Sequence, residues 1–213
     1  MNFSALRKML VIAPHPDDEV FGCGGTIALL HATGCDVHVV VLTDGSASHR
    51  NSRKYPKSRL VAIRQAESRR ALAVLGLNAS KVTFLNLTDG ASDQWGRDRA
   101  ALRPLVRMLR HPWGAIFGPA IIDDHPDHRA AAHAVLRNRR SVPYFAYTIW
   151  PTGRYDTGGL ISVPLKSVHK RKRMAAKHYR SQLGMIKDDP DGFSLKPEDL
   201  RRLARPAETF RRQ

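Results

Sequence analysis

The chain has 213 residues, 42% of them hydrophobic, which suits one domain that buries its core without disulfide staples. It has only two cysteines, Cys23 and Cys35, neither in a Cys-x-x-Cys pair, which excludes a disulfide framework. Lys and Arg number 35 against 19 Asp and Glu, so the formal net charge is +16, and no apolar run approaches the ~20 residues of a bilayer span.

Buried strand patterns alternate with helical patterns along the first 150 residues. We expect strands at 9–13, 37–42, 82–87, 115–118 and 144–150, and helices at 26–31, 60–75, 99–109 and 128–137. This alternation predicts a Rossmann-like α/β fold, a mostly parallel sheet with right-handed crossovers and helices on both faces. Because parallel strands are covered on both sides, their near-continuous apolar character agrees with this fold.

The pattern is weaker after Trp150. We expect an edge strand or hairpin at 158–164, a helix at 168–183 and a short helix at 198–203. Residues 1–185 are assigned to the single domain, and 186–213 to a polar C-terminal tail packed on it. The polar N-terminus leads straight into the first strand and leaves no room for a signal peptide, so we expect a cytoplasmic protein without a transmembrane segment.

Two clusters of His and Asp follow the first and fourth expected strands. One reads His15-Pro16-Asp17-Asp18-Glu19, and the other reads Asp123-Asp124-His125-Pro126-Asp127-His128. The carboxyl ends of parallel strands meet at one edge of a sheet, so we expect the clusters to share that edge. So much charge would be costly inside the sheet unless it held a cation or faced a cleft.

The residue types favour a catalytic metal site. His15 and Asp18 are three positions apart on a turn, close enough to bind one ion. His128 or His125 would complete a set of two imidazoles and one carboxylate with an open position, which suits zinc. Zinc would lower the pKa of a bound water to about 7 and polarise a carbonyl oxygen.

The remaining groups of the two clusters suit acid and base roles. Asp17 is left beside the metal as a general base. The second cluster has a spare histidine, which Asp127 could hold as an imidazolium to stabilise an oxyanion and protonate a leaving amine. Together these groups predict metal-assisted amide hydrolysis. The plainer alternative makes Asp17 and Asp18 caps of the following helix.

These motifs resemble the PIG-L/LmbE family of zinc-dependent N-acetylglucosaminyl deacetylases. The resemblance rests on residues 14–19, on Gly24-Gly25-Thr26 and on residues 125–128, and it extends to segments 43–45, 64–67 and 177–182. It implies a hydrolase that removes the acetyl group from an N-acetylglucosamine-type sugar and binds one Zn²⁺ per chain. Amidase activity on another sugar conjugate is an alternative.

The resemblance also implies a role for individual residues. The zinc ligands would be His15, Asp18 and His128, and the catalytic groups would be Asp17 as base, His125 as cationic partner of the intermediate and Asp127 as its orienting carboxylate. Arg64 and Asp44 would contribute to substrate binding. Some members carry a tyrosine shortly before the second motif, where this chain has Ile121-Ile122-Asp123-Asp124, so either Tyr55, Tyr147 or Tyr179 replaces it or no residue does.

The basic charge is concentrated at residues 50–59 and 166–180. We assign Arg53 and Lys54 to an anionic part of a small or conjugated amino-sugar substrate, and we expect no nucleic-acid partner despite the charge. The competing hypothesis is a degenerate, Rossmann-like module that binds nucleic acid or an anionic surface. The resemblance is also compatible with a homo-oligomer.

Overall fold

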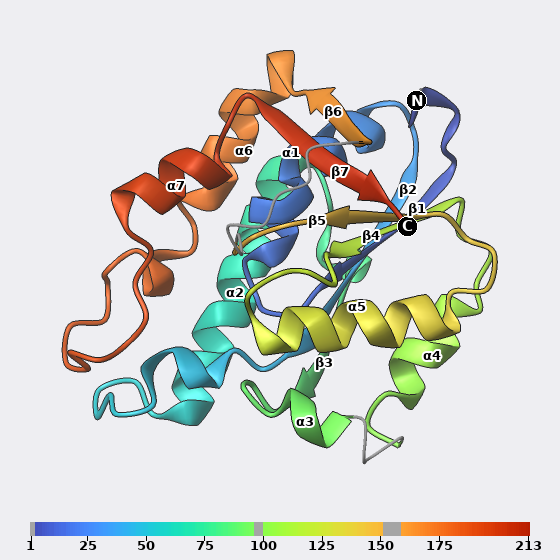
Figure 1. Cartoon of the computed structure of the whole chain (residues 1–213). Helices are drawn as coiled ribbons and strands as arrows, with labels where there is room; N and C mark the ends of the chain where they lie inside the picture. The colour runs from blue at the N-terminus through green and yellow to red at the C-terminus, as the bar shows by residue number, and fades with distance from the viewer. Residues whose placement is uncertain (1–2, 96–99, 151–158) are drawn as a thin grey trace.

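The computed structural model describes residues 3–95, 100–150 and 159–213. Its centre is one sheet with strand order β3-β2-β1-β4-β5-β7-β6 (Figure 1). The first five strands pair in parallel, and β7 pairs antiparallel with both β5 and β6. The strands are β1 (Lys8–Ala13), β2 (Asp36–Thr43), β3 (Val82–Leu87), β4 (Ala115–Pro119), β5 (Tyr144–Tyr147), β6 (Leu160–Pro164) and β7 (Ala207–Arg212).

Helices cover both faces of the sheet, which confirms the predicted fold class (Figure 1). Helices α1, α2 and α6 contact one another in one layer, and α3 and α4 each contact α5 in the other. The helices are α1 (Asp18–Ala32), α2 (Lys57–Leu75), α3 (Ser92–Trp95), α4 (Arg103–Leu109), α5 (Pro126–Asn138), α6 (His169–Ala176) and α7 (Pro197–Leu203). The short 3-10 turns are η1 (Phe3–Ala5), η2 (Ser46–His49), η3 (Ala79–Lys81), η4 (Lys166–Val168) and η5 (Arg180–Gln182).

Strand β1 shows how the central strands are held. Met9 and Val11 belong to the core on one face of the sheet, and Leu10 and Ile12 belong to the core on the other face. All four side chains are fully buried. Successive side chains of a strand point to opposite faces, so a continuous apolar run supplies both cores at once.

The two His/Asp clusters lie where the strand order changes direction. β1 has β2 on one side and β4 on the other, and the clusters follow β1 and β4 directly. At such a switch point the connections leave toward opposite faces and open a crevice beyond the strand ends, where ligands bind in open α/β sheets. The fold therefore brings the clusters together, as the parallel arrangement predicts.

Helix α1 begins earlier than the sequence pattern indicates. It starts at Asp18, not near Thr26, so the acidic motif forms the first turn of the helix. Carboxylates at this end are favoured because they face the positive end of the helix dipole. Gly22 and Gly25 allow close packing here, since an added Cβ would lie 2.6 Å from the Tyr147 ring and 2.3 Å from Leu165.

The helix expected at 168–183 is interrupted. α6 ends at Ala176, and the chain then turns so that the Tyr179 hydroxyl donates a 2.6 Å hydrogen bond to Glu19. Ser181 likewise donates to Glu67 through its backbone N–H and its hydroxyl, at 2.8 and 2.6 Å. These buried contacts with α1 and α2 outweigh continued helical propensity.

The segment 186–213 contributes a strand that the sequence analysis did not predict. β7 lies between β5 and β6, and its Phe210 is fully buried. Glu208 accepts hydrogen bonds from the backbone N–H groups of Gly25 and Thr26, both at 2.8 Å, beside a kink of α1 at Cys23. Lys172 lies 2.7 Å from the same carboxylate.

The last predicted helix is present, and the start of the helix predicted at 99–109 lies outside the described residues. Helix α7 corresponds to the short helix expected at 198–203. Residue 99, where a helix was expected to begin, lies outside the described residues, and the described helix α4 starts at Arg103. Within the three described ranges, every helix is too short or too polar to cross a membrane.

Candidate metal centre and its pocket

Three donor atoms from the two clusters converge beyond the ends of β1 and β4. His15 Nδ1 lies 3.3 Å from Asp18 Oδ2 and 3.3 Å from His128 Nε2, and the last two atoms are 3.1 Å apart. Ligands about 2.0–2.1 Å from a tetrahedral zinc ion are separated by about 3.3 Å. The three atoms are thus spaced as one face of a tetrahedral zinc site, and two imidazoles with one carboxylate are a suitable donor set.

The local fold explains why these side chains meet. His15 follows β1 directly, and its backbone N–H donates a 2.9 Å hydrogen bond to Asp18 Oδ2, which closes the turn. His128 lies in the first turn of α5, a helix that begins with Pro126 and has His125 as its N-cap. Proline is favoured at such a first position because its fixed φ suits the helix and its missing N–H is not needed there.

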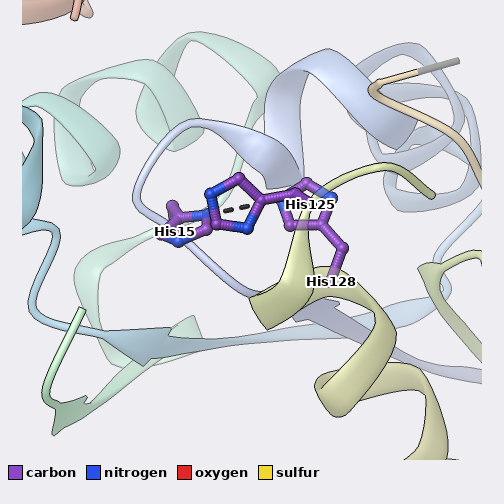
Figure 2. Close-up of side chains that lie close together, drawn as sticks. All are labelled: His15, His125 and His128. Atoms are coloured by element: carbon purple, nitrogen blue, oxygen red, sulfur yellow. Dashed lines mark hydrogen bonds between the residues drawn. The ribbon is translucent and has the colours of Figure 1, made fainter. Parts of the chain in front are cut away.

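Figure 2 shows the rings of His15, His125 and His128 gathered at this point, with a dashed line for the His15–His128 contact. The ring nitrogens of all three lie within 4.8 Å of one another, so His125 is a further candidate ligand. His15, Asp89 and Asp127 form a second such group. These two carboxylates, however, lie against His15 Nε2, whereas Nδ1 of the same ring faces Asp18 and His128.

Carboxylates lie behind both candidate histidine ligands. Asp89 Oδ1 and Asp127 Oδ2 are 3.1 and 3.2 Å from His15 Nε2. Asp123 Oδ1 is 3.3 Å from His128 Nδ1, and both of these side chains are fully buried. Carboxylates in this position fix the tautomer and orientation of a metal-binding imidazole. The sequence analysis gave no role to Asp89 or Asp123, although each belongs to an acidic segment at the end of a strand.

The electrostatics of the cluster favour positive charge. Burial alone would raise the pKa of Asp18, but the adjacent imidazoles of His128 and His15 hold it well below its usual range. Burial would lower the pKa of His128, yet the carboxylates of Asp18 and Asp123 raise it to about 9. The pKa of His15 is also raised, by Asp127, Asp18 and Asp89 against the effect of burial. The carboxylates therefore stabilise a cation at this point.

Asp17 directly precedes Asp18, but its side chain does not cap α1. It occupies the N-cap position, but its side chain makes no capping hydrogen bond, and its φ is 141°. Its Oδ2 instead accepts a 3.1 Å hydrogen bond from Arg64. A non-glycine residue in such a conformation costs about 1–3 kcal/mol and is typical of functional sites. This arrangement disfavours the interpretation of Asp17 as a simple helix cap.

Arg64 is buried, and both terminal nitrogens of its guanidinium donate hydrogen bonds within the protein. It donates to the backbone oxygens of Gly45 and Pro16 at 2.8 and 2.7 Å, besides Asp17. Burial raises the pKa of Asp17 to about 8, and the positive charge of Arg64 opposes that rise. The structure therefore presents Arg64 as a residue that positions Asp17, although it also lines the pocket described below.

His125 differs from the expected imidazolium held by a carboxylate. Its Nδ1 accepts a 3.2 Å hydrogen bond from the backbone N–H of Asp127, whose carboxylate lies against His15 instead. Burial and the neighbouring His15 and His128 lower the pKa of His125 to about 4. The ring is thus neutral with its proton on Nε2, because Nδ1 is occupied as an acceptor. Asp127 orients His125 through its backbone and His15 through its side chain.

A cavity of about 590 Å³ opens at this cluster. Its polar lining includes His15, Asp17, Asp18, Ser48, Arg50, Arg64, Asp89, Asp124, His125 and Gln182. The residues assigned to substrate binding are brought here only in part. Arg64 lines the cavity, whereas Asp44, Arg53 and Lys54 do not belong to its lining. Asp44 accepts from Ser46 and pairs with Lys57, so it orders the loop after β2.

The basic loop contributes Arg50 to the lining of the cavity, and not the Arg53 and Lys54 that we assigned to the substrate. Arg53 and Lys54 are exposed, and the Lys54 backbone N–H donates to Asp188 at 2.8 Å. This bond ties the loop to the C-terminal segment, while Arg50 lines the cavity. Nothing in the sequence separates one arginine of this loop from another, because their positions depend on how the loop folds.

The described residues provide no tyrosine in the lining of the cavity. Tyr147 donates to the backbone oxygen of Ile12 at 2.7 Å, and Tyr179 donates to Glu19. Both are fully buried and act in the core. Tyr55 is half-buried outside the lining. The segment 121–124, shortly before the second cluster, instead contains Asp123, whose Oδ1 lies 3.3 Å from His128 Nδ1.

Comparisons with known proteins agree with these motifs. Residues 10–138 match the family model PIG-L, described as GlcNAc-PI de-N-acetylase. A diacetylchitobiose deacetylase of Thermococcus kodakarensis is 32% identical over 136 residues, which cover 61% of this chain and 48% of that protein. A 1D-myo-inositol 2-acetamido-2-deoxy-alpha-D-glucopyranoside deacetylase of Mycobacterium sp. (strain KMS) is 31% identical over 173 residues, or 67% of this chain and 54% of that protein. The chain thus spans about half the length of these curated relatives.

A solved structure extends the agreement in fold to nearly the whole chain. The N,N'-diacetylchitobiose deacetylase from Pyrococcus horikoshii superposes with a TM-score of 0.76 at 24% identity, covering 99% of this chain and 85% of that chain. Such identity establishes a common fold only. The family model, however, covers more than half of the sequence and includes both His/Asp clusters. The chain therefore belongs to the PIG-L family.

Proposed function

We propose that the protein is a metal-dependent hydrolase that removes the acetyl group from an N-acetylglucosamine-type sugar. The observation that carries this proposal is the triangle of His15 Nδ1, Asp18 Oδ2 and His128 Nε2, with sides of 3.1–3.3 Å, beside a cavity that His15 and Asp18 line. Family membership and the deacetylase activity for which these relatives are named support the same reaction class.

One Zn²⁺ per chain, held by these three residues, would supply a water of lowered pKa and a positive charge for the amide oxygen. Asp17 takes up the proton of the attacking water, because its carboxylate lines the same cavity as His15 and Asp18 and has no capping role. Arg64 holds Asp17 in place and favours its ionised form.

His125 acts through the Nε2 proton of its neutral ring. It lines the cavity and is fixed by the hydrogen bond from the Asp127 backbone to its Nδ1. From there its Nε2–H donates a hydrogen bond to the oxygen of the acetamide. The C–N bond breaks, acetate forms, and the amine leaves with the proton that Asp17 took from the water, so Asp17 returns to its ionised form.

Metal content and amine release together test the proposal. The protein is purified without chelator, its zinc is measured, and amine release is followed from N-acetylglucosamine, its 6-phosphate and N,N'-diacetylchitobiose. Asp17→Asn is compared with Asp93→Asn, which removes an exposed carboxylate from α3. We expect about one zinc per chain in all three proteins and a loss of about 10²–10⁴-fold in kcat for Asp17→Asn alone.

Three outcomes would contradict the proposal or one of its assignments. A protein that stays inactive on every sugar after zinc is added, yet binds DNA with steep salt dependence, would favour the basic binding module. Unchanged activity of Asp17→Asn would overturn the assignment of the base. Release of amine from another sugar conjugate, but from none of these acetamides, would favour an amidase of different specificity.

A further inference from the structure

The cavity at the metal centre also has an extensive apolar lining. Its members are Phe21, Ile149, Trp150, Phe193, Leu195 and Leu203. All except Phe21 lie beyond residue 138, where the match to the family model ends. The chemical groups of the site therefore come from the family segment, whereas most of this apolar wall comes from the C-terminal part of the chain.

Trp150 and Phe193 form the aromatic part of the wall. Their ring centroids are 5.9 Å apart with an interplanar angle of 85°, an edge-to-face arrangement. Phe193 is 37% exposed, so much of this large apolar ring remains open to a ligand. Arg202 lies over the Trp150 ring at 5.7 Å and donates to the Ile149 backbone oxygen at 2.7 Å. Contacts within the protein thus hold the wall in place without a ligand.

Asp123 ties this wall to the candidate metal ligands. Its Oδ2 accepts hydrogen bonds from the backbone N–H groups of Ile149 and Trp150 at 2.8 and 3.1 Å. Its Oδ1 lies 3.3 Å from His128 Nδ1. The backbone N–H of Asp124 also donates to the Trp150 oxygen at 3.1 Å. The position of Trp150 relative to the histidines is therefore fixed by several bonds.

The size and charge of the cavity indicate what the wall binds. A volume of about 590 Å³ lies in the range that holds drug-sized ligands, which exceed a single amino sugar. Arg50 and Asp124 line the cavity with opposite charges, while Arg53 and Lys54 lie outside the lining. The part of the ligand that extends away from the histidines thus meets apolar side chains more than cationic ones.

We propose that the Trp150–Phe193 wall binds an apolar aglycone, an alkyl or aryl group attached to the amino sugar. This inference rests on the proposed function, because it assigns the rest of the substrate whose acetamide lies at the histidine cluster. The aglycone gains affinity by transferring apolar surface from water to the two rings and to Leu195 and Leu203. The wall is a specificity determinant and takes no part in the chemical step.

Binding of sugars that contain no acetamide tests the wall separately from catalysis. Octyl β-D-glucopyranoside, below its micelle concentration, and phenyl β-D-glucopyranoside are titrated into zinc-loaded protein by calorimetry, with glucose and cellobiose as comparisons. Trp150→Ala and Phe193→Ala are the test variants, and both are checked for zinc content and thermal unfolding. Trp113→Ala is the matched control, because Trp113 is half-buried and lies outside the cavity lining.

We expect the alkyl and aryl glucosides to bind at least tenfold more tightly than glucose, and each wall variant to weaken them about tenfold. Trp113→Ala should leave both affinities unchanged. Equal affinity for octyl glucoside and glucose, or equal affinities in wild type and folded wall variants, would overturn the proposal. Cellobiose binding that is tighter than octyl glucoside and lost in Trp150→Ala would assign the wall to a second sugar ring instead. Absence of deacetylation with wall-dependent binding intact would reject the proposed function alone.

Discussion

Asp123 Oδ1 lies 3.3 Å from His128 Nδ1, while Nε2 of the same imidazole lies 3.1 Å from Asp18. One ring is therefore held between a supporting carboxylate and a candidate metal-binding carboxylate. Asp123 also accepts from the His125 backbone N–H at 3.0 Å. A single buried side chain thus orders the start of α5 and places a negative charge beside His128 Nδ1.

Replacement of Asp123 should weaken metal binding without removing any direct ligand. We expect Asp123→Asn to lower zinc affinity about 10–100-fold, because the amide supports the imidazole less strongly than the carboxylate does. The measurement is competition with a chromogenic zinc chelator. Asp124→Asn is the matched control, since it removes one negative charge from an exposed neighbour in the same loop. Equal zinc affinities of Asp123→Asn and Asp124→Asn would show that zinc affinity depends only on the net charge of this loop.

Removal of the Arg64 guanidinium should destabilise the fold as well as the site. Arg64 is 3% exposed and pairs with a buried carboxylate, so Arg64→Ala leaves Asp17 without its cationic partner. We expect a loss of about 3–5 kcal/mol in the free energy of unfolding, measured with urea on metal-free protein. Arg69→Ala, an exposed change on the same helix, should cost much less. A similar, small loss for both variants would mean that Asp17 is stabilised by other groups.

The basic loop should influence anionic substrates through Arg50 only. We expect Arg53→Ala and Lys54→Ala to leave KM unchanged for both N-acetylglucosamine and its 6-phosphate, because neither side chain lines the cavity. Arg50→Ala should raise KM for the phosphate about 2–5-fold, the effect of losing one exposed charge interaction. Steady-state kinetics on both sugars at two salt concentrations would check this. An increase in KM for Lys54→Ala would place part of the substrate outside the cavity.

Glu208 should matter for stability although it lies far along the chain from α1. It is 4% exposed, and it receives Lys172 and the N–H groups that start the second half of α1. Glu208→Ala should lower the free energy of unfolding by about 3–5 kcal/mol, because it leaves a buried ammonium unpaired. The double variant Glu208→Leu with Lys172→Met should recover part of that loss. Urea unfolding of wild type, Glu208→Ala and the double variant measures these losses. A double variant no more stable than Glu208→Ala would show that Glu208 acts independently of Lys172.

Long, uniform patterns were the predictable part of the fold. The apolar runs of β1, β2 and β4 identify buried strands, and their shared orientation places both His/Asp clusters at one edge of the sheet. Asp17 and Asp18 could be recognised as functional because two adjacent carboxylates at a strand end need a compensating charge. These inferences depend on local sequence and on a general rule for parallel sheets.

The features that could not be predicted depend on distant partners. β7 contains Glu208 and two arginines, which is unusual for an inner strand, and it is stable there because Lys172 lies against the glutamate. The interruption after α6 depends on Glu19, which is far away in sequence and accepts a hydrogen bond from the Tyr179 hydroxyl. The role of Asp123 depends in part on the backbone of Ile149, 26 positions further along the chain, which donates to its carboxylate.

The place of β7 also bears on the order in which the sheet is made. β6 joins the rest of the sheet through β7, which follows it by more than forty residues in the chain. During synthesis, β5 and β6 therefore cannot pair with β7 until residues 207–212 have left the ribosome. Until then the nascent chain presents an open sheet edge to chaperones or to other nascent chains.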